Sequence, residues 1–292
     1  MPLFIGCPVW SFKGWVGNFY PLGTKPSDYL MEYARRLTSI EANTTFYALP
    51  GSKTIASWIK DTPDLFRFCP KLPKAISHLG NLTENIDKAH EFIGRMQELG
   101  SRLGPIFLQL PPAFSIKAFQ ELEVFLESWP KKIRLAVEVR HRDWFGPSQH
   151  PKLVGMLQRL RMEQVILDTC PIRELAPRLF PGSDVYDPLV YQPGSVGRVK
   201  GSIALEDRFT FLRFAGHPRR QFNSPFLEGW VDRLTPRLAA REDVYVFCHS
   251  PDPRFAPFIG RLLYRMIAER VPLPVLPWDD LETGAYQQRE LF

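Results

Sequence analysis

The chain has 292 residues, of which 45% are apolar and 23% are charged, and this balance is that of an ordinary globular protein. No stretch approaches the ~20 apolar residues of a membrane span, the first residues lack the basic start of a signal peptide, and the four cysteines form no CxxC pair typical of zinc or redox sites. The net charge of +6 suits a phosphate-bearing partner, although a generally basic surface explains it as well. We therefore expect a cytoplasmic protein with no membrane partner.

Eight short β-rich runs follow one another along the chain, separated by helical patterns. The predicted strands are residues 3–6, 39–43, 66–71, 105–110, 134–139, 164–169, 210–215 and 244–249. The predicted helices include residues 26–37, 83–99, 115–129, 224–238 and 254–270, several of which open with a Ser, Asp or Thr cap. This succession predicts an α/β fold, a single (β/α)8 TIM-type barrel over residues 1–270. A doubly wound open sheet is the alternative, but no GxGxxG motif follows the first run.

Two segments depart from this succession. Residues 170–208 are dense in Pro and Gly and follow the sixth predicted strand, on the side where barrel active sites lie. We predict that this insertion forms a lid or a substrate-binding wall, and the alternative is a flexible insertion without such a role. Residues 271–292 are predicted to form an extended C-terminal tail.

Polar side chains stand at the end of nearly every predicted strand. Because the C-terminal ends of barrel strands converge, we expect these side chains to share one pocket. Side chains alternate along a strand, so Glu41 and Asn43 share one face, as do Glu138 and Arg140. The candidate catalytic residues are Glu41, Lys71, Glu138, Asp168 and His249. The candidate substrate-binding residues are Trp10, Asn43, Tyr47, Gln109, Arg140, His141, Trp144, Arg213 and His217.

This mixture of acids and cations favours a polar, anionic substrate. Acids beside cations keep low pKa values, and such a set can supply a general base, a general acid and clamps for negative charge. An internal salt-bridge network that only orients the strand ends is the alternative. The aromatic candidates can stack on a sugar or a base, and their alternative is packing within the loops.

The sequence requires no metal. Lys71, Arg140 and Arg213 would repel a divalent ion, whereas a weakly bound Mg²⁺ or Mn²⁺ that shares substrate phosphates is compatible with the carboxylates. The cofactor is otherwise unknown at this stage.

Six stretches carry a family resemblance: EANTTFYALP, FRFCPKLPKAISH, LQLPPAF, VEVRHRDWF, VILDT and CHSPDPRFAP. Together they resemble the YecE-like proteins, the domain of unknown function 72, along the whole chain. The resemblance implies a TIM-type barrel without an established activity. It therefore supports the predicted fold and leaves the function open.

The leading hypothesis is an enzyme, a hydrolase or lyase, that acts on a phosphate-bearing substrate such as nucleic acid or a phosphorylated sugar. A non-catalytic nucleic-acid-binding protein is one alternative, since basic charge and aromatic side chains also suit that role. A glycoside-active enzyme is another. The familiar barrel glycosidases carry acids on strands four and seven, whereas this sequence has Gln109 and Arg213 there.

The tail carries a separate motif. Residues 288–292, QRELF, resemble the Gln-x-x-Leu-Phe peptide by which bacterial repair and replication proteins dock on the DNA sliding clamp. In that resemblance Gln288 binds a polar subsite, while Leu291 and Phe292 fill an apolar pocket. Arg289 departs from the Leu that is usual at the second position. The preceding Pro-rich stretch is a candidate spacer. The alternative is that Leu291 and Phe292 pack on the protein's own surface.

Overall fold

The computed structural model describes residues 3–172 and 208–281. All eight predicted strands lie in these ranges, and the sixth is divided at Val165. The strands are β1 (Leu3–Gly6), β2 (Ser39–Ala42), β3 (Arg67–Pro70), β4 (Ile106–Gln109), β5 (Leu135–Glu138), β6 (Glu163–Gln164), β7 (Ile166–Asp168), β8 (Phe209–Ala215) and β9 (Asp243–His249). The α-helices are α1 (Tyr29–Ala34), α2 (Thr44–Tyr47), α3 (Ser52–Lys60), α4 (Lys74–Ser77), α5 (Ile86–Gln97), α6 (Phe119–Glu127), α7 (Gln149–Arg159), α9 (Ser224–Ala239) and α10 (Ala256–Ala268).

The strands form three sheets whose paired strands all run parallel. Their orders are β1-β9-β8-β7, β2-β3 and β4-β5-β6. Backbone hydrogen bonds also connect neighbouring sheets. The N–H of Glu41 donates to the carbonyl of Cys7 at 3.1 Å, and the N–H of Leu72 donates to the carbonyl of Phe107 at 2.9 Å. The protein therefore has an α/β fold built on parallel sheets.

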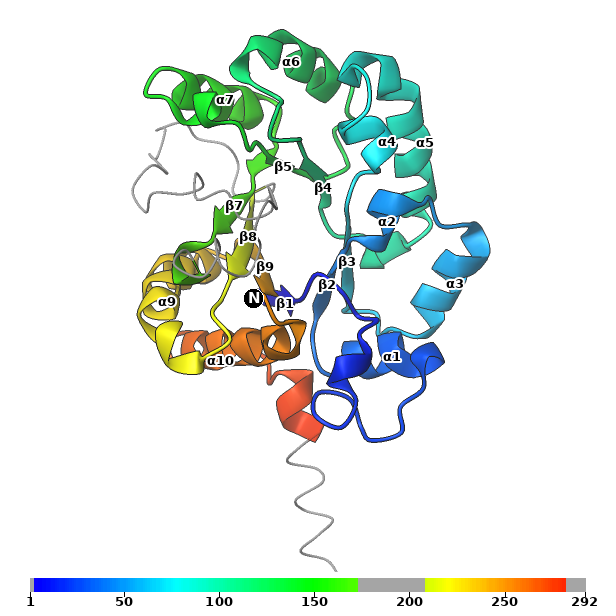
Figure 1. Ribbon diagram of the computed structural model, residues 1–292, viewed down its shortest axis with the longest axis vertical. Helices are drawn as coiled ribbons and strands as arrows, with labels where there is room; N and C mark the ends of the chain where they lie inside the picture. Colours follow the sequence, from blue (N-terminus) through cyan, green and yellow to red (C-terminus); the bar gives the residue numbers. More distant parts are fainter. Residues whose placement is uncertain (1–2, 173–207, 282–292) are drawn as a thin grey trace, which may run out of the picture.

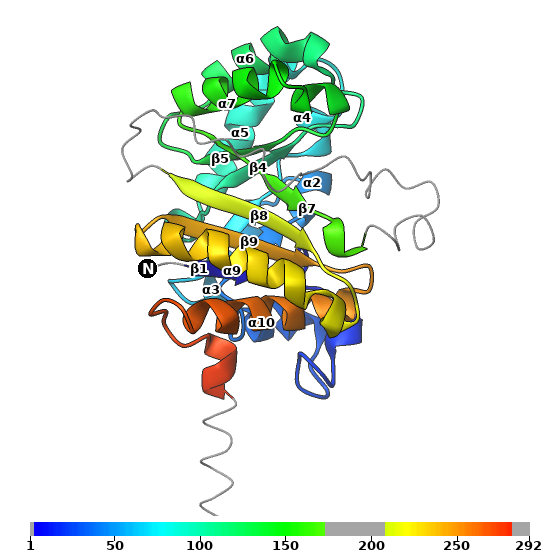
Figure 2. The ribbon, with the colours of Figure 1, turned by 90° about the vertical axis from the view of Figure 1, so that its left-hand side faces the viewer.

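The helices lie around the outside of the strands, in chain order from α1 to α10 (Figure 1). In the view turned by 90°, α9 and α10 lie along β8 and β9 (Figure 2). Helix α10 shows how this arrangement arises. Its buried residues include Ile259, Leu263 and Ile267, which recur every four positions and so form one apolar face directed at the strands.

Alternation along the strands produces two separate apolar clusters. Residues such as Ile40, Leu108 and Val246 point toward the helices and belong to the larger cluster. The opposite face of the strands carries a second cluster without helical residues, formed by Cys69, Phe107, Ala136, Val165, Phe209, Phe211, Tyr245 and Phe247. We call this second cluster the strand-lined core. Polar residues two positions beyond its members therefore lie above it, at the C-terminal ends of the strands.

The first part of the predicted tail packs on the body of the protein. Residues 277–281 are helical, and the ring of Trp278 packs against Phe19 and Phe258 at centroid distances of 4.9 and 5.2 Å. Asp279 accepts hydrogen bonds from Arg261 and Arg265, one turn apart on α10. Residues 277–281 are therefore not extended as predicted, because these contacts hold a helical turn. A spacer that leads to residue 288 begins no earlier than residue 282.

Several sequence predictions lie outside the described residues. They are the clamp-like residues Gln288, Leu291 and Phe292 and most of the insertion at residues 170–208. Within residues 3–172 and 208–281, no helix is long and apolar enough to cross a membrane.

Candidate functional site

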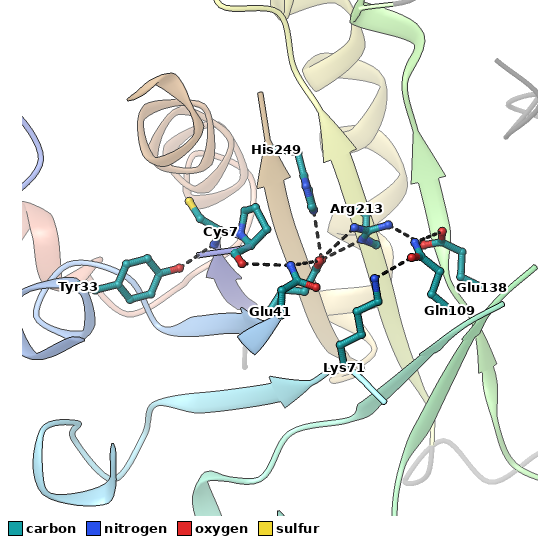
Figure 3. Close-up of polar contacts among 10 residues, drawn as sticks. Cys7, Tyr33, Glu41, Lys71, Gln109, Glu138, Arg213 and His249 are labelled. Atoms are coloured by element: carbon teal, nitrogen blue, oxygen red, sulfur yellow. Dashed lines mark hydrogen bonds and ion pairs between the residues drawn. The ribbon is translucent and has the colours of Figure 1, made fainter. Parts of the chain in front are cut away.

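A continuous network of hydrogen bonds and ion pairs lies at the C-terminal ends of the strands (Figure 3). It links side chains from six strands or from the residues directly after them, in the order Lys71, Gln109, Glu138, Arg213, Glu41 and His249. These six were all singled out from the sequence as strand-end residues. We call them the mouth network.

Arg213 on β8 is the centre of the mouth network. Its Nη1 donates to Oε2 of Glu138 at 2.8 Å, while its Nε and Nη2 donate to the two carboxylate oxygens of Glu41 at 2.9 and 3.0 Å. Burial alone would lower the pKa of Arg213, but the two carboxylates outweigh it and raise that pKa above its usual value. The guanidinium also lies 5.0 Å from the ring centroid of Phe107, a member of the strand-lined core. Arg213 is thus a fixed, permanently charged guanidinium held between two carboxylates.

Glu41 on β2 is fully buried, and both of its oxygens are occupied. Besides Arg213, Nδ2 of Asn43 donates to Oε1 at 2.9 Å, and Nε2 of His249 lies 3.1 Å from Oε2. Burial would raise the pKa of Glu41, but Arg213 and His249 hold it well below the usual 4.5. Glu41 therefore stays ionised, and with four donors around it, it positions Arg213 and His249 rather than accepting a proton.

The neighbouring strand β1 fixes the backbone at Glu41. The hydroxyl of Tyr33 accepts from the N–H of Cys7 at 2.6 Å and donates to the carbonyl of Ser39 at 2.9 Å. Glycine is required at position 6, because a Cβ there would lie 2.1 Å from the carbonyl oxygen of Ser39. This close approach of β1 to β2 allows the backbone hydrogen bond between Glu41 and Cys7.

Lys71, directly after β3, stands at the other end of the mouth network. Its Nζ donates to Oε1 of Gln109 at 2.7 Å, and Nε2 of Gln109 donates to Oε1 of Glu138 at 2.7 Å. The ring of Phe46 lies under the amine, with its centroid 4.1 Å from Nζ. Among the described residues, no carboxylate lies within ion-pair distance of Nζ, since Arg213 occupies both nearby acids.

This environment lowers the pKa of Lys71 to about 8. Burial is the main cause, since only 8% of the residue is exposed, and the positive charges of Arg213 and Arg140 act in the same direction. Glu41 and Glu138 oppose the shift without cancelling it. A substantial fraction of Lys71 is therefore a neutral amine at slightly alkaline pH, which is unusual for lysine.

His78 and Phe46 complete this end of the site. Burial, followed by the charges of Lys71 and Arg140, lowers the pKa of His78 to about 4, so its ring is neutral at pH 7. The ring packs edge to face on Phe46 at 5.1 Å. The sequence analysis did not single out His78. The available signal was its place in the connection that follows the third strand, seven residues after Lys71.

Comparison with known proteins identifies the family. The sequence pattern of the family described as protein of unknown function DUF72 matches residues 4–281. The chain belongs to the DUF72 family. It is 32% identical over 281 residues to the UPF0759 protein YecE of Escherichia coli strain K12, covering 94% of this chain and 97% of the relative. It is 24% identical to the UPF0759 protein YunF of Bacillus subtilis strain 168, covering 85% and 88%. The predicted resemblance to the YecE-like proteins is confirmed.

Solved structures of the family share the fold of this DUF72 protein. A DUF72 protein from Thermotoga maritima superposes with a TM-score of 0.63 at 21% identity, over 92% of this chain and 100% of that one. A second, from Enterococcus faecalis, gives a TM-score of 0.61 at 17% identity, over 94% and 98%. These similarities concern the fold alone.

Asp168, a predicted catalytic residue, does not join the mouth network in this DUF72 protein. Its Oδ2 accepts from Nε1 of Trp230 on α9 at 2.7 Å, and its Oδ1 accepts from the N–H of Cys170 at 2.9 Å. In the register of β7 and β8, Asp168 stands opposite Phe214, one position beyond Arg213. It therefore lies on the helix-facing side of the strand, and placing it in the shared pocket was wrong.

The aromatic candidates also separate. Trp144 is fully buried, donates from Nε1 to the carbonyl of Phe114 at 2.7 Å and stacks on that ring, so it packs the loop and offers no surface to a substrate. Trp10 is half-buried against Trp58. Tyr47 is 82% exposed beside Phe46 and is the aromatic candidate most accessible to a ligand.

The remaining candidates lie outside the mouth network. Nδ1 of His141 accepts from the N–H of Asp143 at 3.2 Å and caps the turn at Arg142–Phe145. Nδ1 of His217 accepts from the N–H of Arg219 at 2.9 Å and shapes its own loop. Both are local contacts within the loops that follow the strands.

The donor set does not fit a metal ion. Among the described residues, no group of three or more His, Cys, Asp or Glu side chains could hold one. The oxygens of Glu41 already accept from N–H groups, and Glu138 accepts from Gln109 and Arg213. A divalent ion at this place would have to displace Arg213 from its carboxylates.

Proposed function

We propose that this DUF72 protein is an enzyme, a hydrolase or lyase, that binds a phosphate-bearing substrate beside Lys71 and uses that lysine for proton transfer. One observation carries the proposal: a buried network from six strands ends in an amine that has no carboxylate partner among the described residues. A purely structural lysine at this depth would ordinarily be paired with an acid.

The proposal includes a closed (β/α)8 barrel formed by the three sheets. Backbone hydrogen bonds between β1 and β2 and between β3 and β4, and the single-residue interval at Val165 between β6 and β7, support this arrangement. The similarity to solved DUF72 structures is consistent with it. In such a barrel the mouth network occupies the end where active sites are built.

The cations near Lys71 and His78 favour an anionic group at this place. Arg140 and Arg213 both lower the pKa of Lys71, and Lys71 and Arg140 both lower that of His78, so their charges act on the same small region. A phosphate placed there would be attracted by these cations and would raise the pKa of Lys71 when it binds. A free nucleotide, a sugar phosphate or a nucleic-acid strand would satisfy this requirement.

Lys71 is suited to acid–base work because its pKa of about 8 lies near physiological pH. Gln109 and Glu138 fix its position, while Arg213 orients Glu138 through an ion pair. Hydrolysis and elimination can both use such a group. The arrangement does not favour glycoside hydrolysis, since that chemistry needs two carboxyl groups facing the sugar, and Glu41 and Glu138 are buried against one arginine.

Phosphate release from a panel of sugar phosphates and nucleotides tests the proposal. We expect the wild type to release phosphate or a phosphate-bearing product, and Lys71→Met to be slower by at least about a hundredfold, as for loss of a general acid or base. Inorganic phosphate should bind Lys71→Met about tenfold more weakly or worse, because a charge-assisted hydrogen bond contributes about 1.5–3 kcal/mol. Lys74→Met, at an exposed lysine three residues away, should match the wild type. Equal phosphate affinity in all three proteins would contradict the proposal.

A further inference from the structure

Lys71 has the surroundings of a nucleophilic amine as well as those of a proton carrier. A lysine becomes nucleophilic when it is desolvated or stands beside other cations. Lys71 meets both conditions, with the ring of Phe46 at 4.1 Å, the ring of Phe107 at 5.6 Å and the guanidinium of Arg213 in the same layer.

The hydrogen bonding of Lys71 leaves its lone pair for a reaction. The amine donates to a neutral amide oxygen of Gln109, and a neutral amine can keep that bond through one of its two N–H groups. The carboxylates that would hold a proton on Nζ, Glu41 and Glu138, are instead bound to Arg213. Loss of the proton therefore breaks no ion pair of Lys71 in the described chain.

We propose that Lys71 forms an imine with the carbonyl group of a phosphate-bearing aldehyde or ketone. The proposal rests on the proposed function and names its substrate class. Nζ attacks the carbonyl carbon, the carbonyl oxygen leaves as water with the two amine protons, and a C=N bond replaces the C=O bond with no net oxidation or reduction.

The imine gives the mouth network a chemical purpose. Once protonated, it draws electrons from the adjoining carbon, so that a proton on that carbon is lost more readily, and this is the step that elimination requires. The fixed charge of Arg213 beside Lys71 disfavours a protonated free amine before the substrate arrives. The anionic phosphate of the substrate then compensates for the positive charge of the protonated imine.

Pyridoxal 5′-phosphate is the probe, because it carries an aldehyde and a phosphate in one small molecule. We expect it to form a visible aldimine that borohydride reduces to a stable adduct, and peptide mapping to place the adduct on Lys71. At pH 7.5 the neutral fraction of an amine with a pKa of about 8 exceeds that of an ordinary lysine by roughly two-hundredfold. Labelling of Lys71 should accordingly precede labelling of Lys74, and its rate should rise with pH to a plateau above about 8.

Two variants and a second ligand separate the possible outcomes. Lys71→Arg keeps a cation but cannot form an imine, and Lys71→Met removes both; each should lose the fast adduct, whereas Lys74→Met should keep it. Pyridoxine 5′-phosphate, the corresponding alcohol, reports phosphate binding without imine chemistry. If it binds the wild type but the aldehyde does not label Lys71 faster than Lys74, the imine is refuted and the proposed function stands. If neither compound binds, the proposed function fails as well.

Discussion

The two ends of the strands contrast in how they are built. At the C-terminal end the mouth network buries charged groups, with Glu41 and Glu138 at most 1% exposed. At the N-terminal end, where Leu3 and Asp243 begin their strands, a cavity of about 760 Å³ is lined largely by apolar side chains. Its cations stay at the rim, where Arg134 pairs with Asp243 and Arg67 donates to backbone carbonyls.

The contrast shows that the volume of a cavity does not identify the candidate site in this molecule. The cavity at the N-terminal end is roomy, but its lining is largely apolar and carries few charged groups. The mouth is crowded, yet it carries buried charges whose desolvation costs several kcal/mol each before they pair. A fold that only needed stability could place apolar residues there, so the charged end is where a function is expected.

Arg213→Met should have the largest effect on this contrast. It leaves Glu41 and Glu138 buried without their shared cation, and we expect the free energy of unfolding to fall by about 3–5 kcal/mol. Arg67→Met at the opposite end removes hydrogen bonds to two backbone carbonyls and should cost about 1 kcal/mol. Urea denaturation of both variants measures the difference. Similar losses in the two would show that the mouth network is no more tightly held than the rim of the cavity.

Acid should weaken the mouth before it affects the apolar end. The pKa of Glu41 is lowered on folding, so its contribution to stability is present above 4.5 and is lost as the pH falls from 4.5 toward the folded value. We expect the free energy of unfolding to lose about 1.4 kcal/mol per pH unit from this group. Glu41→Gln should be less stable at neutral pH and flatter between pH 5 and about pH 3.5, as judged by urea midpoints. If the substitution leaves the pH dependence of the free energy of unfolding unchanged, Glu41 is not its cause.

Much of this arrangement could be predicted from the sequence, because side chains alternate along each strand and Glu41, Glu138 and Arg213 all fall on the side that faces away from the helices. The same alternation gave the wrong side for Asp168. In the run VILDT the three residues before Asp168 are all apolar, so the pattern does not tell which face points to the helices. The partner Trp230 on α9, 62 residues later in the chain, decides it.

The burial of aromatic side chains in loops was the second feature that the sequence did not predict. Trp144 follows a strand end as Tyr47 does, and the sequence treats them alike. One is fully buried against Phe114 and the other is 82% exposed, because the folding of two separate connections sets their surroundings. The lowered pKa of Lys71 could not be predicted either, since it depends first on the burial of the amine and then on the charges of Arg213 and Arg140 beside it.

The smallest expected effect concerns the tail, which begins at the apolar end. Pro274, Val275 and Pro277 line the cavity there, and the helical turn at 277–281 is fixed to α10. The last described residues of the tail therefore lie at the opposite end of the strands from the mouth network. We expect clamp binding to the tail to leave the affinity of the mouth for phosphate unchanged.

Titration of the whole protein against purified sliding clamp tests this, together with the double variant Leu291→Ala and Phe292→Ala. Two anchors and a non-standard Arg289 lead us to expect a dissociation constant between about 1 µM and 1 mM, equivalent to about 4–8 kcal/mol. The double variant should abolish binding without changing stability, because residues that dock on a partner contribute nothing to the free fold. If Leu291 and Phe292 instead pack on the protein's own surface, the clamp will not bind and the double variant will lower the free energy of unfolding by about 2 kcal/mol or more. That result would show that the two side chains pack on the protein itself, and it would contradict recruitment by the clamp.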